Sequence, residues 1–223
     1  EIAGLKTLKN TIGFVPTMGA LHYGHVSLIE RARRECNVVV ASIFVNPTQF
    51  NDKNDLLKYP RSPEKDLAML EATGTDLVFM PDVSVMYPEN EAEEKFEFGN
   101  LDKVLEGAHR PGHFKGVARV VAKLFRIVTP DRAYFGEKDF QQLAIIRELV
   151  KKMNSPIKIV ACETVREDSG LAMSSRNMLL SENERAEAAK ISKALFYVRD
   201  NLNKYEIVEL EEYAIKKIEE NGL

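Results

Sequence analysis

The sequence predicts an α/β protein with a Rossmann-like, doubly wound parallel sheet. Two observations lead to this prediction: short apolar runs alternate with longer segments of helical periodicity, and polar residues gather where the apolar runs end. The strand candidates are Ile12 to Val15, Val38 to Phe44, Leu77 to Met80, Ala133 to Phe135 and Ile157 to Ala161. The helices expected between them cover Val26 to Cys36, Ser62 to Ala72, His113 to Val128 and Asp139 to Met153.

Local signals support each of these elements. The strand candidates are apolar at consecutive positions, as parallel strands covered on both faces are. Ser62 and Pro63 have the residue types that favour the cap and the first position of a helix. Apolar residues recur on one face of the helix that begins at His113, and this face is expected in the core: Val117, Val120, Val121 and Leu124. Three apolar residues before this helix are also expected in the core: Leu101, Val104 and Leu105.

The pattern changes near residue 181. Ser181-Glu182-Asn183-Glu184 is a capping box, which predicts a charged helix to about Leu202, and a further helix is expected from Val208 to Asn221. We therefore expect residues 1–170 to form the Rossmann-like domain. Residues 171–223 would begin a smaller, helical C-terminal domain.

Composition limits the classes of partner. With 223 residues and 44% hydrophobic content the chain can bury a full core, and a net charge of -3 argues against binding to nucleic acid or to anionic membranes. No apolar run is long enough to span a bilayer, and the two cysteines, Cys36 and Cys162, form no C-x-x-C pattern. These features predict a cytoplasmic protein that acts on small molecules.

A decapeptide between the first predicted strand and helix is the strongest candidate site. Its sequence is Pro-Thr-Met-Gly-Ala-Leu-His-Tyr-Gly-His, residues 16–25. A helix N-terminus attracts phosphate, Gly24 allows a ligand to approach the backbone, and His22 and His25 share one face of the first turn. The pattern predicts a nucleotide phosphate site with imidazolium donors.

Three other segments carry polar side chains at strand or loop ends. Lys138 and Asp139 follow the fourth strand. Lys138 would contact a phosphate, and Asp139 would contact either a ribose hydroxyl or Mg²⁺. The segment Ala172 to Asn177 combines small hydroxyl groups with Arg176, which suits polyphosphate binding. Asn46 and Gln49 follow the second strand, where amides can read the hydroxyl groups of a substrate.

A zinc site is the main alternative for the histidines. All four fall into two clusters, one with His22 and His25 and the other with His109 and His113. Pro111 and Gly112 interrupt the helical spacing of the second cluster, which argues against metal ligation. A different adenylyltransferase, or a non-catalytic nucleotide-binding protein, also remains open at this point.

Two distant motifs resemble those of a known superfamily. The His-x-Gly-His helix start and the Met-Ser-Ser-Arg loop are similar to the HIGH and KMSKS motifs of nucleotidylyltransferases and class I aminoacyl-tRNA synthetases, which bind ATP. Five segments in order, from about Thr11 to Ser181, more closely resemble the pantothenate synthetase family: the decapeptide, Ser-Ile-Phe-Val-Asn-Pro-Thr-Gln-Phe, Arg-Pro-Gly-His-Phe, Phe-Gly-Glu-Lys-Asp-Phe-Gln-Gln and Gly-Leu-Ala-Met-Ser-Ser-Arg-Asn.

The resemblance implies an activity and a set of site residues. The activity is the ATP-dependent, Mg²⁺-assisted joining of (R)-pantoate to β-alanine through a pantoyl-adenylate, with release of pyrophosphate and AMP. His25 would be the proton donor with His22 beside it, and Lys138 and Arg176 would hold phosphate charge. The implied ATP contacts are Met18, Gly19, His22, Gly24, His25, Gly136, Glu137, Lys138, Asp139, Val165, Met173, Ser174, Ser175 and Arg176.

The same resemblance implies a pocket for the acid substrate. Gln49 and Gln142 would contact pantoate, with Gln49 next to the β-alanine position, and the further substrate residues would be Asn46, Glu106 and His113. Members of the family are commonly homodimers with a longer C-terminal domain that contains further strands. The C-terminal domain of this sequence is therefore expected to be truncated, and closure of the site is in question.

Overall fold

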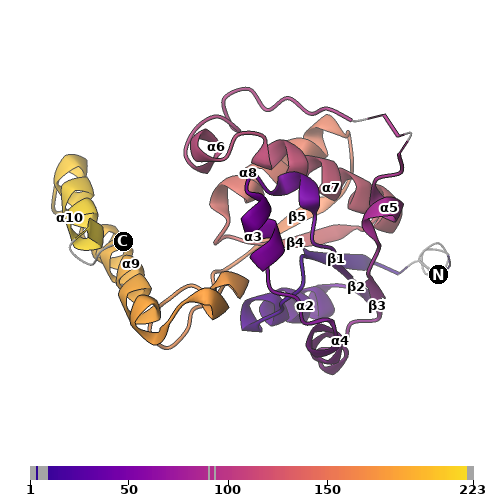
Figure 1. Ribbon diagram of the computed structural model, residues 1–223, viewed down its shortest axis with the longest axis horizontal. Coiled ribbons are helices and arrows are strands. Elements are labelled where there is room, and N and C mark those ends of the chain that lie inside the picture. Colours follow the sequence, from indigo (N-terminus) through magenta and orange to yellow (C-terminus); the bar gives the residue numbers. More distant parts are fainter. Residues whose placement is uncertain (1–3, 5–9, 90, 93, 220–223) are drawn as a thin grey trace. The chain divides into compact units, whose positions relative to one another are not determined.

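The computed structural model describes residues 4, 10–89, 91–92 and 94–219 (Figure 1). Contacts divide the chain into two compact units, Glu1–Glu163 and Thr164–Leu223, whereas the sequence placed the boundary after residue 170. Residues on either side of that expected boundary are paired. The backbone N–H of Met173 donates to Val165 O at 3.0 Å, and the backbones of Arg166 and Ala172 form an isolated antiparallel β-bridge.

The first unit is built on a five-stranded parallel sheet. Its strands are β1 (Ile12–Thr17), β2 (Val38–Ile43), β3 (Leu77–Phe79), β4 (Arg132–Gly136) and β5 (Lys158–Cys162), in the order β3-β2-β1-β4-β5. The doubly wound parallel sheet predicted from the sequence is confirmed. Strand β1 pairs with β2 along its whole length, from Ile12 opposite Val38 to Thr17 opposite Ile43.

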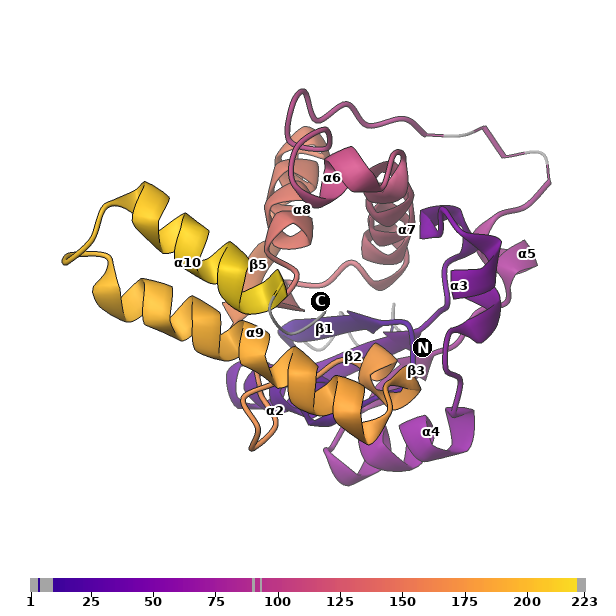
Figure 2. The same cartoon turned by 60° about the vertical axis from the view of Figure 1, so that its left-hand side comes forward.

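Helices cover both faces of this sheet. Helices α2 (Tyr23–Glu35) and α4 (Pro63–Ala72) lie on one face, and α7 (His113–Val128) and α8 (Phe140–Lys152) on the other (Figures 1 and 2). Alternate strand residues enter opposite cores. Phe14 and Val40 pack with α7 and α8, whereas Val15 and Val39 pack with α2 and α4. The sheet is thus buried on both faces, which explains its continuous apolar strands.

Short elements after the second strand complete the unit. They are the 3-10 turn η1 (Pro47–Gln49) and the helices α3 (Lys53–Lys58), α5 (Val83–Met86) and α6 (Glu106–His109). The expected core positions on α7 are confirmed, but Val104 and Leu105 are 47% and 67% exposed. They precede α6, and Val104 is held by its backbone carbonyl, which accepts from Gln141 Nε2 at 2.7 Å. The expectation that their side chains are in the core is therefore wrong.

The second unit is mainly helical from Ser175 onward, within the part of it that is described. It contains the 3-10 turn η2 (Ser175–Leu179) and helices α9 (Glu182–Asn201) and α10 (Ile207–Glu219). The predicted capping box is present, with Ser181 Oγ accepting from Glu184 N and Glu184 accepting from Ser181 N. Tyr197 and Tyr213 stack with ring centroids 4.0 Å apart and join α9 to α10. The last two residues of the helix expected to end at Asn221 lie outside the described part.

None of the helices in the described ranges is both long enough and apolar enough to cross a membrane.

Candidate active site

The site lies at the carboxyl end of the sheet, where β1 and β4 are neighbours. The chain leaves β1 for α2 on one face and β4 for α8 on the other. At such a switch point the two loops diverge and leave a crevice in which ligands of α/β proteins bind. The loop after β1 carries His22 and His25, and the loop after β4 carries Lys138 and Asp139.

A left-handed turn connects β1 to α2. Gly19 and Ala20 have φ values of 78° and 50°, a conformation that glycine adopts readily and alanine does not. Thr17 Oγ1 accepts from Gly19 N at 3.2 Å and donates to Ser42 O at 2.7 Å. Thr17 therefore ties the start of the turn to the end of β2.

Asp66, on α4, is the main contact that holds this turn. Its carboxylate oxygens accept from the backbone N–H groups of Ala20 at 2.9 Å and Leu21 at 2.7 Å, and the side chain is only 2% exposed. Hydrogen bonds to a buried carboxylate are among the stronger ones in proteins. Asp66 thereby fixes the residue before His22. The sequence reasoning missed it, although its i, i+4 spacing from the buried Leu70 was a signal that it faces inward.

His22 and His25 cap the helix that they begin. His22 is the N-cap of α2, and its Nδ1 accepts from Gly24 N at 3.1 Å. His25 Nδ1 in turn accepts from His22 N at 3.3 Å, and the two rings lie 4.1 Å apart between centroids. An Nδ1 atom that accepts carries no proton, so each neutral ring has its hydrogen on Nε2. The two rings therefore offer Nε2–H donors.

The two rings are neutral near pH 7. Burial, followed by the charges of His22 and Lys138, lowers the pKa of His25 to about 3. Burial, followed by Lys138, also lowers the pKa of His22, while Asp139 acts in the opposite direction. The sequence predicted imidazolium donors. The structure differs because the two rings are partly buried, lie against each other and are near an ammonium group.

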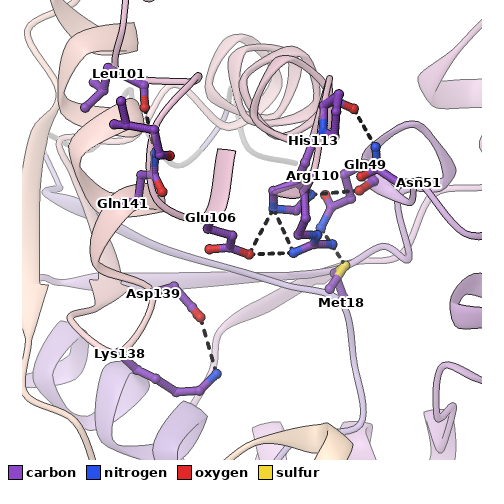
Figure 3. Close-up of polar contacts among 12 residues, drawn as sticks. Met18, Gln49, Asn51, Leu101, Glu106, Arg110, His113, Lys138, Asp139 and Gln141 are labelled. Atoms are coloured by element: carbon purple, nitrogen blue, oxygen red, sulfur yellow. Dashed lines mark hydrogen bonds and ion pairs between the residues drawn. The ribbon is translucent and has the colours of Figure 1, made fainter. Parts of the chain in front are cut away.

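The loop after β4 supplies the charged side chains of the candidate site. Glu137 N donates to Cys162 O at 2.8 Å, which ties the start of the loop to the end of β5. Lys138 and Asp139 are exposed and form an ion pair of 3.3 Å, drawn in Figure 3. A methyl group added at Gly136 would meet no atom within 4 Å, so the backbone there is open to a ligand.

Gln49 is held from several directions. Its Oε1 accepts from Asn46 Nδ2 at 3.0 Å, its backbone oxygen lies 2.8 Å from His113 Nδ1, and its Nε2 contacts Met18 Sδ at 3.1 Å. Gly116 permits α7 to pack against the turn, since a side chain there would overlap the backbone of Thr48. Asn46 and His113 are 1% and 5% exposed. They shape the site mainly through Gln49.

A charged cluster lies beside Gln49. Arg110 bonds Glu106 at 2.6 Å and approaches His113 Nε2 at 3.2 Å, as Figure 3 shows. Gln142 is partly buried on α8. Its neighbour Gln141 is buried, and its Nε2 donates to Leu101 O at 2.8 Å, which anchors the segment before α6. The sequence reasoning named neither Arg110 nor Gln141 as site residues.

The remaining expected ATP contacts lie in the second unit. The backbone bond between Met173 and Val165 makes these two residues neighbours. Ser174 caps η2, and its Oγ accepts from Arg176 N at 3.3 Å. Ser175 is buried, whereas Arg176 is exposed. The residues expected at the phosphates therefore form two groups, one in each unit.

A zinc site built from the four histidines would require their rings to lie together. Within the described ranges no three histidine, cysteine, aspartate or glutamate side chains are grouped so that they could hold a metal ion. His113 uses both ring nitrogens in contacts with Gln49 and Arg110. The four-histidine site thus lacks geometric support.

The fold defines a Rossmann-like α/β protein in which two histidines and an ion pair lie in the loops at the switch point of the sheet. The family model described as Pantoate-beta-alanine ligase matches residues 1–223. The chain belongs to this family of enzymes.

Several relatives show the same kinship. The chain is 57% identical over 194 residues to a pantothenate synthetase of Porphyromonas gingivalis, covering 87% of this chain and 69% of the relative. It is 52% identical to that of Bacteroides thetaiotaomicron, covering 99% of this chain and 78% of the relative.

Solved structures agree with these sequence matches. The pantothenate synthetase of Thermus thermophilus superposes with a TM-score of 0.91 at 46% identity, covering 98% of this chain and 80% of the other. The pantoate-beta-alanine ligase of Francisella tularensis, solved with beta-gamma ATP and beta-alanine, gives 0.83 at 40% identity, covering 97% and 84%.

The low pKa of His25 predicts a specific dependence of stability on pH. Below pH 6.5 the unfolded chain binds a proton at this ring and the folded chain does not, so the free energy of unfolding falls as the pH is lowered. The expected contribution is up to about 1.4 kcal/mol per pH unit between pH 6.5 and 5. Urea unfolding at pH 7, 6 and 5 measures it. The variant His25→Asn should lose most of this dependence and the exposed-site variant His109→Asn should keep it; equal dependence in all three proteins would contradict the assignment.

The turn held by Asp66 predicts a second result. An asparagine at this position can accept with only one oxygen, so Asp66→Asn leaves one backbone N–H facing an NH₂ group. Misplacing His22 and His25 by about 1 Å should lower kcat of the ligase reaction by about 100-fold. Steady-state kinetics measure this effect, with Glu64→Gln on the exposed side of α4 as the matched control. A wild-type kcat in Asp66→Asn would show that the turn does not need the carboxylate.

Proposed function

We propose that this chain joins (R)-pantoate to β-alanine, using ATP and forming pantoyl-adenylate as the intermediate. The observation that carries the proposal is the placement of the loops after β1 and β4 at the switch point of the sheet. There, two Nε2–H donors at a helix start lie close enough to Lys138 for its charge to lower the pKa of both histidines. Helix start, donors and ammonium together favour a polyphosphate.

In the first step, a carboxylate oxygen of pantoate attacks the α-phosphorus of ATP. The new O–P bond forms as the bond to the β-phosphate breaks, and pyrophosphate leaves. His22 and His25 would donate hydrogen bonds from Nε2 to phosphate oxygens, and the phosphate charge would raise the pKa of both rings, strengthening these bonds as the pyrophosphate charge develops. Lys138 would hold phosphate charge within the first unit, and Arg176 is proposed to do so from the second.

The other ATP contacts follow the motif assignments. We propose that the backbone and side chains at the helix start and after β4 line the triphosphate, and that the second unit contributes the Ser-Ser-Arg turn with its neighbours. The residues so assigned are Met18, Gly19, Gly24, Gly136, Glu137, Asp139, Val165, Met173, Ser174 and Ser175.

In the second step, the amine of β-alanine attacks the acyl carbon of the adenylate. The C–N bond forms, the bond to AMP breaks, and the amine loses a proton. Gln49 and Gln142 are proposed to orient pantoate so that its carboxylate first meets the α-phosphate and the adenylate then meets the amine. Asn46, Glu106 and His113 support this pocket, with Asn46 and His113 acting through Gln49. Holding both reactants in this way can lower the barrier by about 7–11 kcal/mol.

Mg²⁺, a homodimer and a cytoplasmic location complete the proposal. Mg²⁺ is commonly held by substrate phosphates, waters and one or two carboxylates, a role that Asp139 at the phosphate side of the crevice fits. When bound, the ion would neutralise phosphate charge. The homodimer follows from the resemblance to the family, and the location from the composition.

The experiment that tests the function supplies the protein with ATP, Mg²⁺, pantoate and β-alanine. AMP and pantothenate should appear in equal amounts, and omission of β-alanine should leave pantoate-dependent exchange of pyrophosphate into ATP. Exchange that depends on another acid but not on pantoate would favour a different adenylyltransferase. ATP binding without any exchange would favour a non-catalytic nucleotide-binding protein.

A variant of His25 separates binding from chemistry. His25→Ala should lower the rate of adenylate formation by about 100- to 1,000-fold, because its bond strengthens in the transition state, while ATP affinity falls far less. Single-turnover adenylate formation and ATP calorimetry measure the two effects. His109→Ala provides the matched histidine control. If His25→Ala lost affinity and rate by the same factor, the donor would act in ground-state binding only.

A further inference from the structure

Tyr87 lies outside every motif, yet its hydroxyl contacts Asn46, which in turn bonds Gln49 of the candidate site. It follows α5, and its ring packs against Phe44 at 6.1 Å between centroids and below the Arg119 guanidinium at 4.6 Å. The hydroxyl donates to Asn46 Oδ1 at 2.8 Å. Burial raises the pKa of Tyr87, so the donor keeps its proton.

Asn46 uses both ends of its amide. Its Oδ1 accepts from Tyr87, from Thr48 Oγ1 at 2.9 Å and from Thr48 N at 3.3 Å. Its Nδ2 donates to Gly116 O at 3.2 Å and to Gln49 Oε1 at 3.0 Å. Donors surround the oxygen and acceptors surround the nitrogen, so the amide has one orientation.

This orientation determines which end of Gln49 is the donor. Because Gln49 Oε1 accepts from Asn46, Nε2 is the end that faces Met18 in the loop before His22, as Figure 3 shows. Thioether sulfur is a weak acceptor. An oxygen atom of a ligand at this place would be a better partner for the N–H groups of Gln49 than the sulfur is.

We propose that Tyr87 is a positioning residue for the acid substrate. Its hydroxyl holds Asn46, and Asn46 fixes the Gln49 amide with its N–H groups directed to an oxygen of pantoate. The inference rests on the proposed function, since it assumes that Gln49 contacts pantoate. The pocket would then favour a hydrogen-bond acceptor of the substrate beside Gln49. Tyr87 would determine this preference through Asn46, without contacting the substrate itself.

The test removes one oxygen atom. Tyr87→Phe should raise the KM for pantoate about 3- to 10-fold, the size expected for the loss of one neutral hydrogen bond, and should leave kcat and the KM for ATP within twofold. Calorimetry of pantoate binding should show the same weakening. Tyr134→Phe is the matched control, because it removes another buried hydroxyl, bonded to Glu35 at 3.2 Å on the side of β4 that packs with α2. Its KM for pantoate should not change.

A second variant reverses the orientation of Gln49. Asn46→Asp keeps an acceptor for Tyr87 and Thr48 but faces both Gln49 Oε1 and Gly116 O with a carboxylate oxygen. The backbone oxygen of Gly116 cannot change its character, whereas the Gln49 amide can rotate, so it should invert and present its own oxygen to pantoate. The KM for pantoate should rise more than in Tyr87→Phe, by at least about 30-fold with the charge included. The KM for ATP should rise far less.

Three outcomes would overturn the inference. These are a pantoate KM within twofold of wild type in Tyr87→Phe, an equal rise in the KM for ATP, or a smaller effect in Asn46→Asp than in Tyr87→Phe. Failure of the underlying function would be seen separately, as wild-type protein that makes no pantothenate.

Discussion

The site depends on one buried carboxylate. Asp66 accepts two consecutive backbone N–H groups and so holds the left-handed turn between β1 and α2. The turn determines where α2 begins, and the start of α2 determines which residues cap it. A carboxylate on a helix packed against the same face of the sheet can hold this turn without adding length to the loop. The sheet therefore places the loops of the site. Asp66 on α4 fixes the first of these loops, the turn between β1 and α2, through two hydrogen bonds.

Capping then gives both histidines a defined chemical state. Each Nδ1 is occupied by a backbone N–H group, and burial lowers the pKa of both rings. Neutral rings at a helix N-terminus do not repel each other strongly, and they keep Nε2–H groups for a ligand. Donors that are fixed before the substrate arrives need no reorganisation during the reaction, which is the feature of a site that stabilises developing charge. Gln49 is prepared in a similar way, with Asn46 determining its donor end.

The sequence predicted what depends on local pattern. Five strands and the main helices followed from periodicity, and the two histidines followed from their position between a strand and a helix. The charge state of His25 could not be predicted, because it depends on burial beside His22 and Lys138. Asp66 and Tyr87 act on residues more than 40 positions away, so no local motif contains them. Val104 and Leu105 were misplaced because an apolar residue in a short loop can be held by its backbone.

The central claim is that helix capping holds His22 and His25 as neutral Nε2–H donors for a phosphate ligand. Nitrogen-15 NMR of the imidazole groups at pH 7, assigned with single-histidine variants, tests it most directly. The account predicts unprotonated Nδ1 and protonated Nε2 in both rings, and on addition of ATP the larger change at Nε2. Rings protonated on Nδ1, imidazolium in the free protein, or Nε2 signals that do not respond to ATP would contradict it.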